Sequence, residues 1–115
     1  MTPDQEDLLE HIVDYLCEEQ AEAVAGLSDA EIRRRALLAI RRAERYELEQ
    51  PEAITAFASL MFLVAPDFDA QPNITKALGD TDIPAALRLT QIFEKTSEGD
   101  WEEAAEKSKG WDSLR

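Results

Sequence analysis

The sequence has a single cysteine and no long uninterrupted apolar run, and these shortages argue against two classes of protein. Cys17 has no partner for an internal disulfide, so the chain is unlike a disulfide-stapled secreted domain. The most apolar stretch, residues 51–69, is too short for a helix that spans a bilayer, which needs roughly 20 apolar residues. The first residues, MTPDQEDLLE, are acidic where a secretory signal would be basic and then apolar. We therefore expect a cytoplasmic protein that does not enter a membrane.

Glycine and histidine are also scarce, which limits the chemistry that the side chains can support. The four glycines are scattered at expected helix ends and form no phosphate-binding loop. His11 and Cys17 fall on different sides of one predicted helix, so they cannot act together as base and nucleophile. His11 shares a face with Asp14 and Glu18, but a surface histidine with acidic neighbours explains this pattern better than a metal site. We therefore predict no enzyme and no catalytic, metal-binding or cofactor-binding residues.

Positive charge is in deficit, because 12 Lys and Arg residues stand against 25 Asp and Glu residues, giving a net charge of −13. Such a field repels nucleic acids and anionic membrane surfaces. It is compatible with a basic or neutral protein partner, although the acidity can also serve solubility alone. With 115 residues, of which 44% are hydrophobic, the chain is expected to fold as one domain.

What the sequence does contain is one segment, residues 51–69, that is apolar on nearly every face. Pro51 suits the first turn of a helix, and Pro66 disfavours helical geometry just before it. Apolar residues recur between the two prolines at helical spacing: Ile54, Phe57, Ala58, Met61, Val64 and Ala65. A helix without a polar face is buried among other helices. We expect the rest of the chain to pack around this one.

Local signals mark the ends of the other helices. The expected starts lie near Pro3, Ser28, Pro72, Pro84 and Asp100, and the expected stops are Gly26, Gly79, Gly99 and Gly110. Capping pairs are predicted for Thr2 with Gln5, Ser28 with Glu31, and Asp100 with Glu103. In the first helix Cys17 belongs to the inward stripe, and in the helix after Pro84 the stripe includes Leu89, Ile92 and Phe93 but not Arg88.

No alternating run or hairpin signal is left over for a β-strand. We predict an all-α fold, a compact bundle of about five to six helices around a central apolar helix, in a single domain. Its parts would be an acidic N-terminal helix (residues 1–26), a core module (27–97) and a short C-terminal helix with a tail (98–115).

Half of the basic residues lie on the predicted second helix: Arg33, Arg34, Arg35, Arg41, Arg42 and Arg45. The acidity of the remaining chain opposes a nucleic-acid site here. One interpretation pairs these arginines with the acidic first and last helices, although exposed pairs of that kind add little stability. The other is recognition of an acidic patch on a protein partner.

Two tryptophans lie on the short C-terminal segment. Trp101 and Trp111 share a helix face with Ala104, Ala105 and Ser108. An apolar stripe of this kind is costly to leave in water, so the tryptophans either dock on the domain or anchor a partner.

The run Asp67, Asp69, Gln71 and Asn73 alternates like the oxygen ligands of a calcium loop. Pro72 and Leu78 occupy the positions that would need glycine and a bidentate glutamate, so we do not predict a calcium site. We expect a polar turn in which Phe68 folds back onto the core.

The segment AIRRAERYELEQPEAITAFASLMFLVAPDFDAQP, residues 39–72, resembles a helical module found in type VI secretion loci. The module occurs as small stand-alone bacterial proteins, and a similar segment ends the adaptor proteins that load toxic effectors onto the VgrG spike. The positions that match its pattern are Ala43, Tyr46, Met61, Phe62, Phe68, Asp69, Leu78 and Arg88. The resemblance covers residues 27–93, about 60% of the chain. Glu47 and Ala65 stand where the pattern has glycine, so both bends are expected to be helical instead of left-handed.

The resemblance implies a non-enzymatic, protein-binding adaptor or chaperone for a type VI secretion effector. The alternative is an immunity protein that occludes a cognate toxin, for which the net charge of −13 is favourable if the toxin is basic. The partner would be a secreted effector, a toxin or a spike component. The candidate contact residues are Arg34, Arg41, Arg42, Arg45, Trp101 and Trp111.

Overall fold

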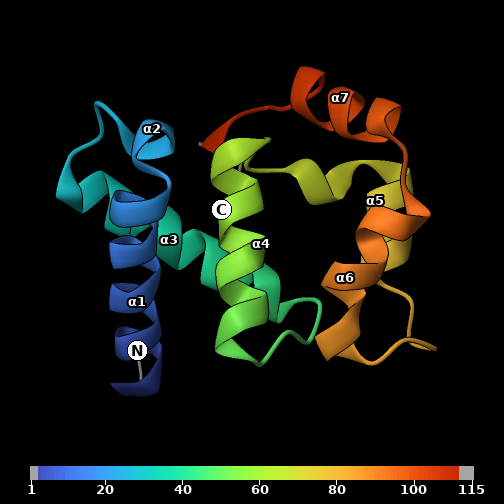
Figure 1. Ribbon diagram of the computed structural model, residues 1–115, viewed down its shortest axis with the longest axis horizontal. Coiled ribbons are helices and arrows are strands. Elements are labelled where there is room, and N and C mark those ends of the chain that lie inside the picture. The colour runs from blue at the N-terminus through green and yellow to red at the C-terminus, as the bar shows by residue number, and fades with distance from the viewer. Residues whose placement is uncertain (1–2, 112–115) are drawn as a thin grey trace.

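The structure is a computed structural model that describes residues 3–111, apart from the side chains of residues 85 and 86. The described residues form seven α-helices and one short 3₁₀ helix, η1, and contain no β-strand (Figure 1). The elements are α1 (Pro3–Glu19), α2 (Ala21–Val24), α3 (Asp29–Glu44), α4 (Pro51–Leu63), η1 (Phe68–Ala70), α5 (Pro72–Leu78), α6 (Ala85–Lys95) and α7 (Glu98–Glu106). The radius of gyration is 13.6 Å, close to the roughly 13 Å of a folded domain of this length. The predicted all-α bundle is confirmed.

Helix α4 is the central element, as its composition predicts. It contacts α1, α2 and α3 on one side and α6 on the other (Figure 1). Phe57, Ala58 and Met61 are completely buried, and they belong to one apolar core cluster to which the neighbouring helices also contribute side chains. The helix begins at Pro51 as expected and ends at Leu63, which is 53% exposed. The enclosure of α4 is therefore incomplete at both of its ends and at Ala56, where side chains are exposed, while the inward-facing residues of the helix are buried.

The first predicted helix is interrupted before it reaches Gly26. α1 ends at Glu19, and Gln20 leaves the helical region with φ −128° and ψ 43° before α2 begins. Gly26 then takes a positive φ of 82°, the left-handed geometry expected of a terminating glycine. The assignment of Cys17 to the inward stripe is wrong, because its side chain is exposed. The predicted cap at Thr2 lies outside the described residues.

The helix boundary predicted at Gly99 is also wrong. α6 ends at Lys95, and Gly99 lies in the first turn of α7. The sequence offers two overlapping capping boxes, and the one that forms pairs Ser97 with Asp100 instead of Asp100 with Glu103. The carboxylate of Asp100 also accepts hydrogen bonds from the side-chain amides of Gln71 (3.1 Å) and Asn73 (2.9 Å). These long-range bonds favour the earlier box, and they could not be read from the local sequence.

Arg88 is buried on α6, although the helical pattern places it outside the inward stripe. The residue is 5% exposed, and its guanidinium donates to the backbone carbonyls of Asp80 (3.1 Å), Ile83 (3.0 Å) and Tyr46 (2.9 Å). Buried loop carbonyls need donors, and an arginine can serve several at once. Arg88 therefore joins the loop after α3 to the turn before α6.

The loop between α3 and α4 contains the one non-glycine residue of positive φ among residues 3–111, Glu47 at 62°. The expectation of a helical bend at this position is wrong, whereas Ala65 does not take a positive φ. Side chains other than glycine pay roughly 1–2 kcal/mol for left-handed geometry, because Cβ approaches the carbonyl oxygen. Leu48, the next residue, is 2% exposed, so the bend turns the chain back into the core.

We predict that Glu47→Gly raises the free energy of unfolding by about 1 kcal/mol, because glycine has no Cβ to strain this bend. Urea denaturation of the full chain measures the change. Glu47→Ala keeps the Cβ but removes the charge, and should not give this gain. Glu49→Gly, in the same loop but without a positive φ, should be neutral or destabilising. A Glu47→Gly chain no more stable than the original would show that the bend is unstrained.

Candidate functional site

The arginines of α3 divide into those that hold the fold and those that face solvent. Arg42 is the clearest structural member: its Nε donates to Oδ1 of Asp69 at 2.6 Å. The side chain of Asp69 is only 2% exposed and that of Arg42 is 16% exposed. A buried carboxylate must be paired or neutralised, so this guanidinium is committed to η1.

Tyr46 completes the surroundings of the Asp69 carboxylate. Its hydroxyl donates to Oδ2 of Asp69 at 2.5 Å, a short bond of the kind that charged acceptors form. Burial raises the pKa of the Tyr46 hydroxyl, and the bond to Asp69 raises it further. Both residues belong to the family-like pattern in the sequence, and the structure gives them a joint structural role.

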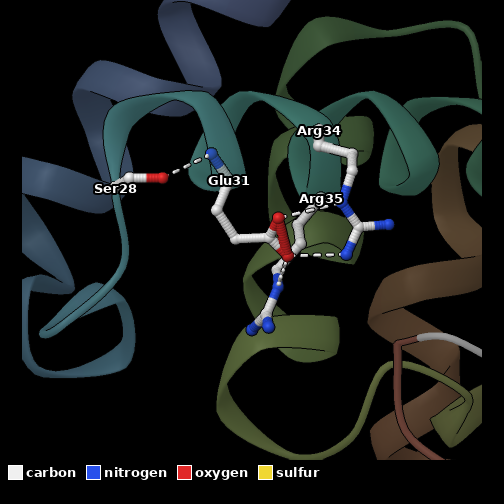
Figure 2. A network of polar contacts seen from close by, with 4 residues as sticks. All are labelled: Ser28, Glu31, Arg34 and Arg35. Atoms are coloured by element: carbon white, nitrogen blue, oxygen red, sulfur yellow. Dashed lines mark hydrogen bonds and ion pairs between the residues drawn. The ribbon is translucent and has the colours of Figure 1, made fainter.

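Arg34 and Arg35 both bind Glu31 near the start of α3, as Figure 2 shows. Glu31 is also the residue whose backbone N–H donates to Ser28 Oγ at 3.1 Å. The predicted capping box is thus half formed, because the Glu31 carboxylate faces two guanidinium groups instead of the backbone of Ser28. Hydrogen bonds from Arg34 first, and then from Arg35, lower the pKa of Glu31 to about 2.

The remaining arginines of this cluster are exposed. Arg33 pairs with Glu10 of α1, which is the pairing with the first helix that the sequence suggests. Arg41 and Arg45 are exposed on the last turns of α3 and its C-cap. Their proposed contact with a partner stays a prediction.

Both tryptophans pack against the domain. Trp101 stacks on Phe68 and Phe93, with ring centroids 5.7 and 5.4 Å away, and its Nε1 donates to Thr96 Oγ1 at 2.9 Å. Trp111 lies 4.9 Å from the ring of Phe62. The tail after α7 therefore returns to α4, as Figure 1 shows.

Arg35 of α3 also contacts Trp111. Its guanidinium carbon lies over the indole ring, 5.3 Å from the ring centroid. A cation over an indole face contributes roughly 0.5–2 kcal/mol. The sequence left two alternatives for the tryptophans, docking on the domain or anchoring a partner. In the structure both side chains dock on the domain. A partner could still contact Trp101 and Trp111 at their half-buried edges, and that role stays a prediction.

Phe68 is completely buried, as expected. The expected polar turn is instead η1 followed by the start of α5, and two of its polar residues, Asp69 and Gln71, are buried. Asp67 accepts a hydrogen bond from the backbone N–H of Lys109 at 2.9 Å, while its buried Oδ1 has no partner among the described residues. Within residues 3–111 we find no group of three or more His, Cys, Asp or Glu side chains placed to bind a metal. His11 and Cys17 are both exposed on α1. None of the described helices combines the length and apolar character needed to cross a bilayer.

Comparisons of the chain with protein-family models, with curated proteins and with solved structures find no match. The likeness to the type VI module therefore stays a prediction based on the pattern of residues 27–93.

We predict that Arg42→Ala lowers the free energy of unfolding by about 3 kcal/mol, because it leaves the Asp69 carboxylate buried without its cation. The matched control is Arg41→Ala on the adjacent, exposed position, which should change stability by less than about 0.5 kcal/mol. Denaturant titrations of both variants provide the comparison. If both variants lose the same free energy of unfolding, the buried Arg42–Asp69 pair contributes no more to stability than an exposed arginine does.

We predict an NMR-titrated pKa of about 2 for the Glu31 carboxyl, well below its ordinary value of 4.5. Because the folded pKa is the lower one, the stabilisation by Glu31 is complete above pH 4.5 and is lost as the pH falls toward 2. The stability difference between the original chain and Glu31→Gln should shrink over that interval. Replacing both Arg34 and Arg35 with alanine should return the pKa toward 4.5. An ordinary Glu31 pKa in the unaltered chain would refute the assignment.

Proposed function

We propose that this chain is a non-enzymatic adaptor or chaperone that binds a type VI secretion effector in the cytoplasm. Binding would use the outer surfaces of the bundle and no reactive side chain. The resemblance of residues 27–93 to the module that ends VgrG adaptor proteins supports the effector as client.

The observation that carries this proposal is the location of the charge. Asp69 is the one acidic residue that is buried as a whole in the described part of the chain, and Arg42 compensates it. The excess of 25 acidic over 12 basic residues is therefore carried mostly at the surface. A surface of that sign attracts basic or charge-neutral protein segments and speeds their encounter.

Exposed apolar and basic side chains add possible contact points. Phe93 is 58% exposed beside the half-buried Trp101, and Arg41 and Arg45 are exposed on α3. Aromatic and arginine side chains contribute disproportionately to protein interfaces. These residues are candidates for the client contact.

The test is purification of the tagged protein from cells that express its native operon. We predict that an effector or a spike component co-purifies in stoichiometric amount and is absent when the operon lacks that gene. Repeated recovery of the chain alone would contradict the adaptor function.

The second candidate, an immunity protein, is favoured by the same net charge of −13, which suits a basic toxin domain. Co-expression with the isolated toxin domain separates the two functions. An immunity protein restores growth, whereas an adaptor that binds elsewhere on the effector leaves the toxicity intact.

A further inference from the structure

An apolar groove opens where the starts of α1 and α4 meet the end of α3. Its volume is about 300 Å³. Apolar side chains line its inner part: Leu8, Ile40, Leu48, Pro51 and Ile54. Figure 1 shows the starts of α1 and α4 on the same lower side of the molecule. This volume is at the small end of the roughly 300–1,000 Å³ typical of small-molecule sites, so it suits one or two side chains of a peptide.

The rim of the groove is acidic. Asp4, Glu44 and Glu49 line its edge, and all three are exposed. Gln5 donates to Glu44 at 3.3 Å, which links the rim from α1 to α3. None of the described residues that line the groove is Lys or Arg; Arg41 and Arg45 belong to the same end of α3 without lining it.

A second hollow continues the groove along the loop after α3. It shares Glu44, Leu48 and Glu49 with the first and adds Glu47. Glu47 is the residue that holds a left-handed φ of 62°. A carboxylate is thus placed on the rim at a position where glycine would be less strained, and strain of this kind concentrates at functional sites.

We propose that this acidic groove binds a basic segment of a protein partner, inserting an apolar side chain between flanking Lys or Arg residues. The apolar floor of the groove is suited to an apolar side chain of the partner. The carboxylates on the rim are suited to the Lys or Arg residues on either side of it; they belong to Asp4, Glu44, Glu47 and Glu49. The inference rests on the proposed function, since it names the surface and the partner chemistry of an adaptor.

Charge also argues against other occupants. A second copy of the chain would bring two acidic rims together, each on a molecule of net charge −13. A nucleic acid would meet carboxylates where phosphates need cations. A basic protein segment is the occupant that the groove complements.

The test measures fluorescence anisotropy of a short labelled peptide in which leucines lie between arginine pairs, titrated with the full chain. We expect binding that weakens as salt rises, because the charges at the rim are exposed. Two comparison peptides separate the contributions: one replaces the leucines with serine, and one replaces the arginines with glutamate. Both should bind at least about tenfold more weakly, a factor that corresponds to 1.4 kcal/mol.

Variants of the chain locate the site. Glu49→Lys on the rim should weaken binding of the leucine–arginine peptide about tenfold. Glu102→Lys, an equal charge reversal on exposed α7, is the matched control and should leave affinity nearly unchanged. Glu47→Gly should weaken binding while raising the unfolding midpoint, so loss of folding cannot explain its effect.

Several results would overturn the inference. Equal binding of the serine peptide, or equal losses in Glu49→Lys and Glu102→Lys, would mean that the net charge alone attracts arginine. Self-association abolished by Glu49→Lys would assign the groove to a second copy. If the operon client still binds Glu49→Lys at full affinity, the groove inference fails while the adaptor function stands. If no client is recovered, the adaptor function fails while the peptide titration still reports on the groove.

Discussion

The arrangement of helices in this bundle depends on one constraint: the buried carboxylate of Asp69 must be paired. A buried carboxylate needs hydrogen-bond donors, and Arg42 in the last turn of α3 and Tyr46 in the following loop supply them. The hydroxyl of Thr75 in α5 also donates to the backbone carbonyl of Asp69. Arg88 then connects the backbone of Tyr46 to the turn before α6. One continuous polar network therefore fixes α3 against η1, α5 and α6.

A series of aromatic rings runs beside this polar network. Neighbouring rings approach to centroid distances between 5.0 and 5.8 Å along a series that runs Tyr46, Phe57, Phe68, Trp101 and Phe93. Tyr46 belongs to both systems, with its hydroxyl on Asp69 and its ring against Phe57. Geometry within this range is favourable for aromatic pairs, and such pairs add to the effect of burial. Polar satisfaction and apolar packing are thus concentrated at one junction, which joins α3, α4, η1, α6 and α7.

The sequence predicted the elements well and their connections less well. Pro51, Ser28 and Pro72 mark helix starts by local backbone chemistry, and the apolar run of α4 shows that it is enclosed. Local patterns could not place Arg88, because the carbonyls that it serves come from three separate positions in the chain. The groove was missed for the same reason, since its floor and rim come from α1, α3, the following loop and α4. Only tertiary packing brings those segments together.

The strained bend at Glu47 connects the junction to the groove. Tyr46 is held on one side by Asp69 and Arg88, and Leu48 is held on the other by burial in the core. With both neighbours fixed, the backbone at Glu47 must reverse between them, and the cost of its positive φ is covered by the contacts of those neighbours. This bend also leaves Glu47 at the surface, where its side chain is exposed and lines the second hollow. Rigid anchoring at the junction is therefore what allows an unfavourable residue to persist at the rim.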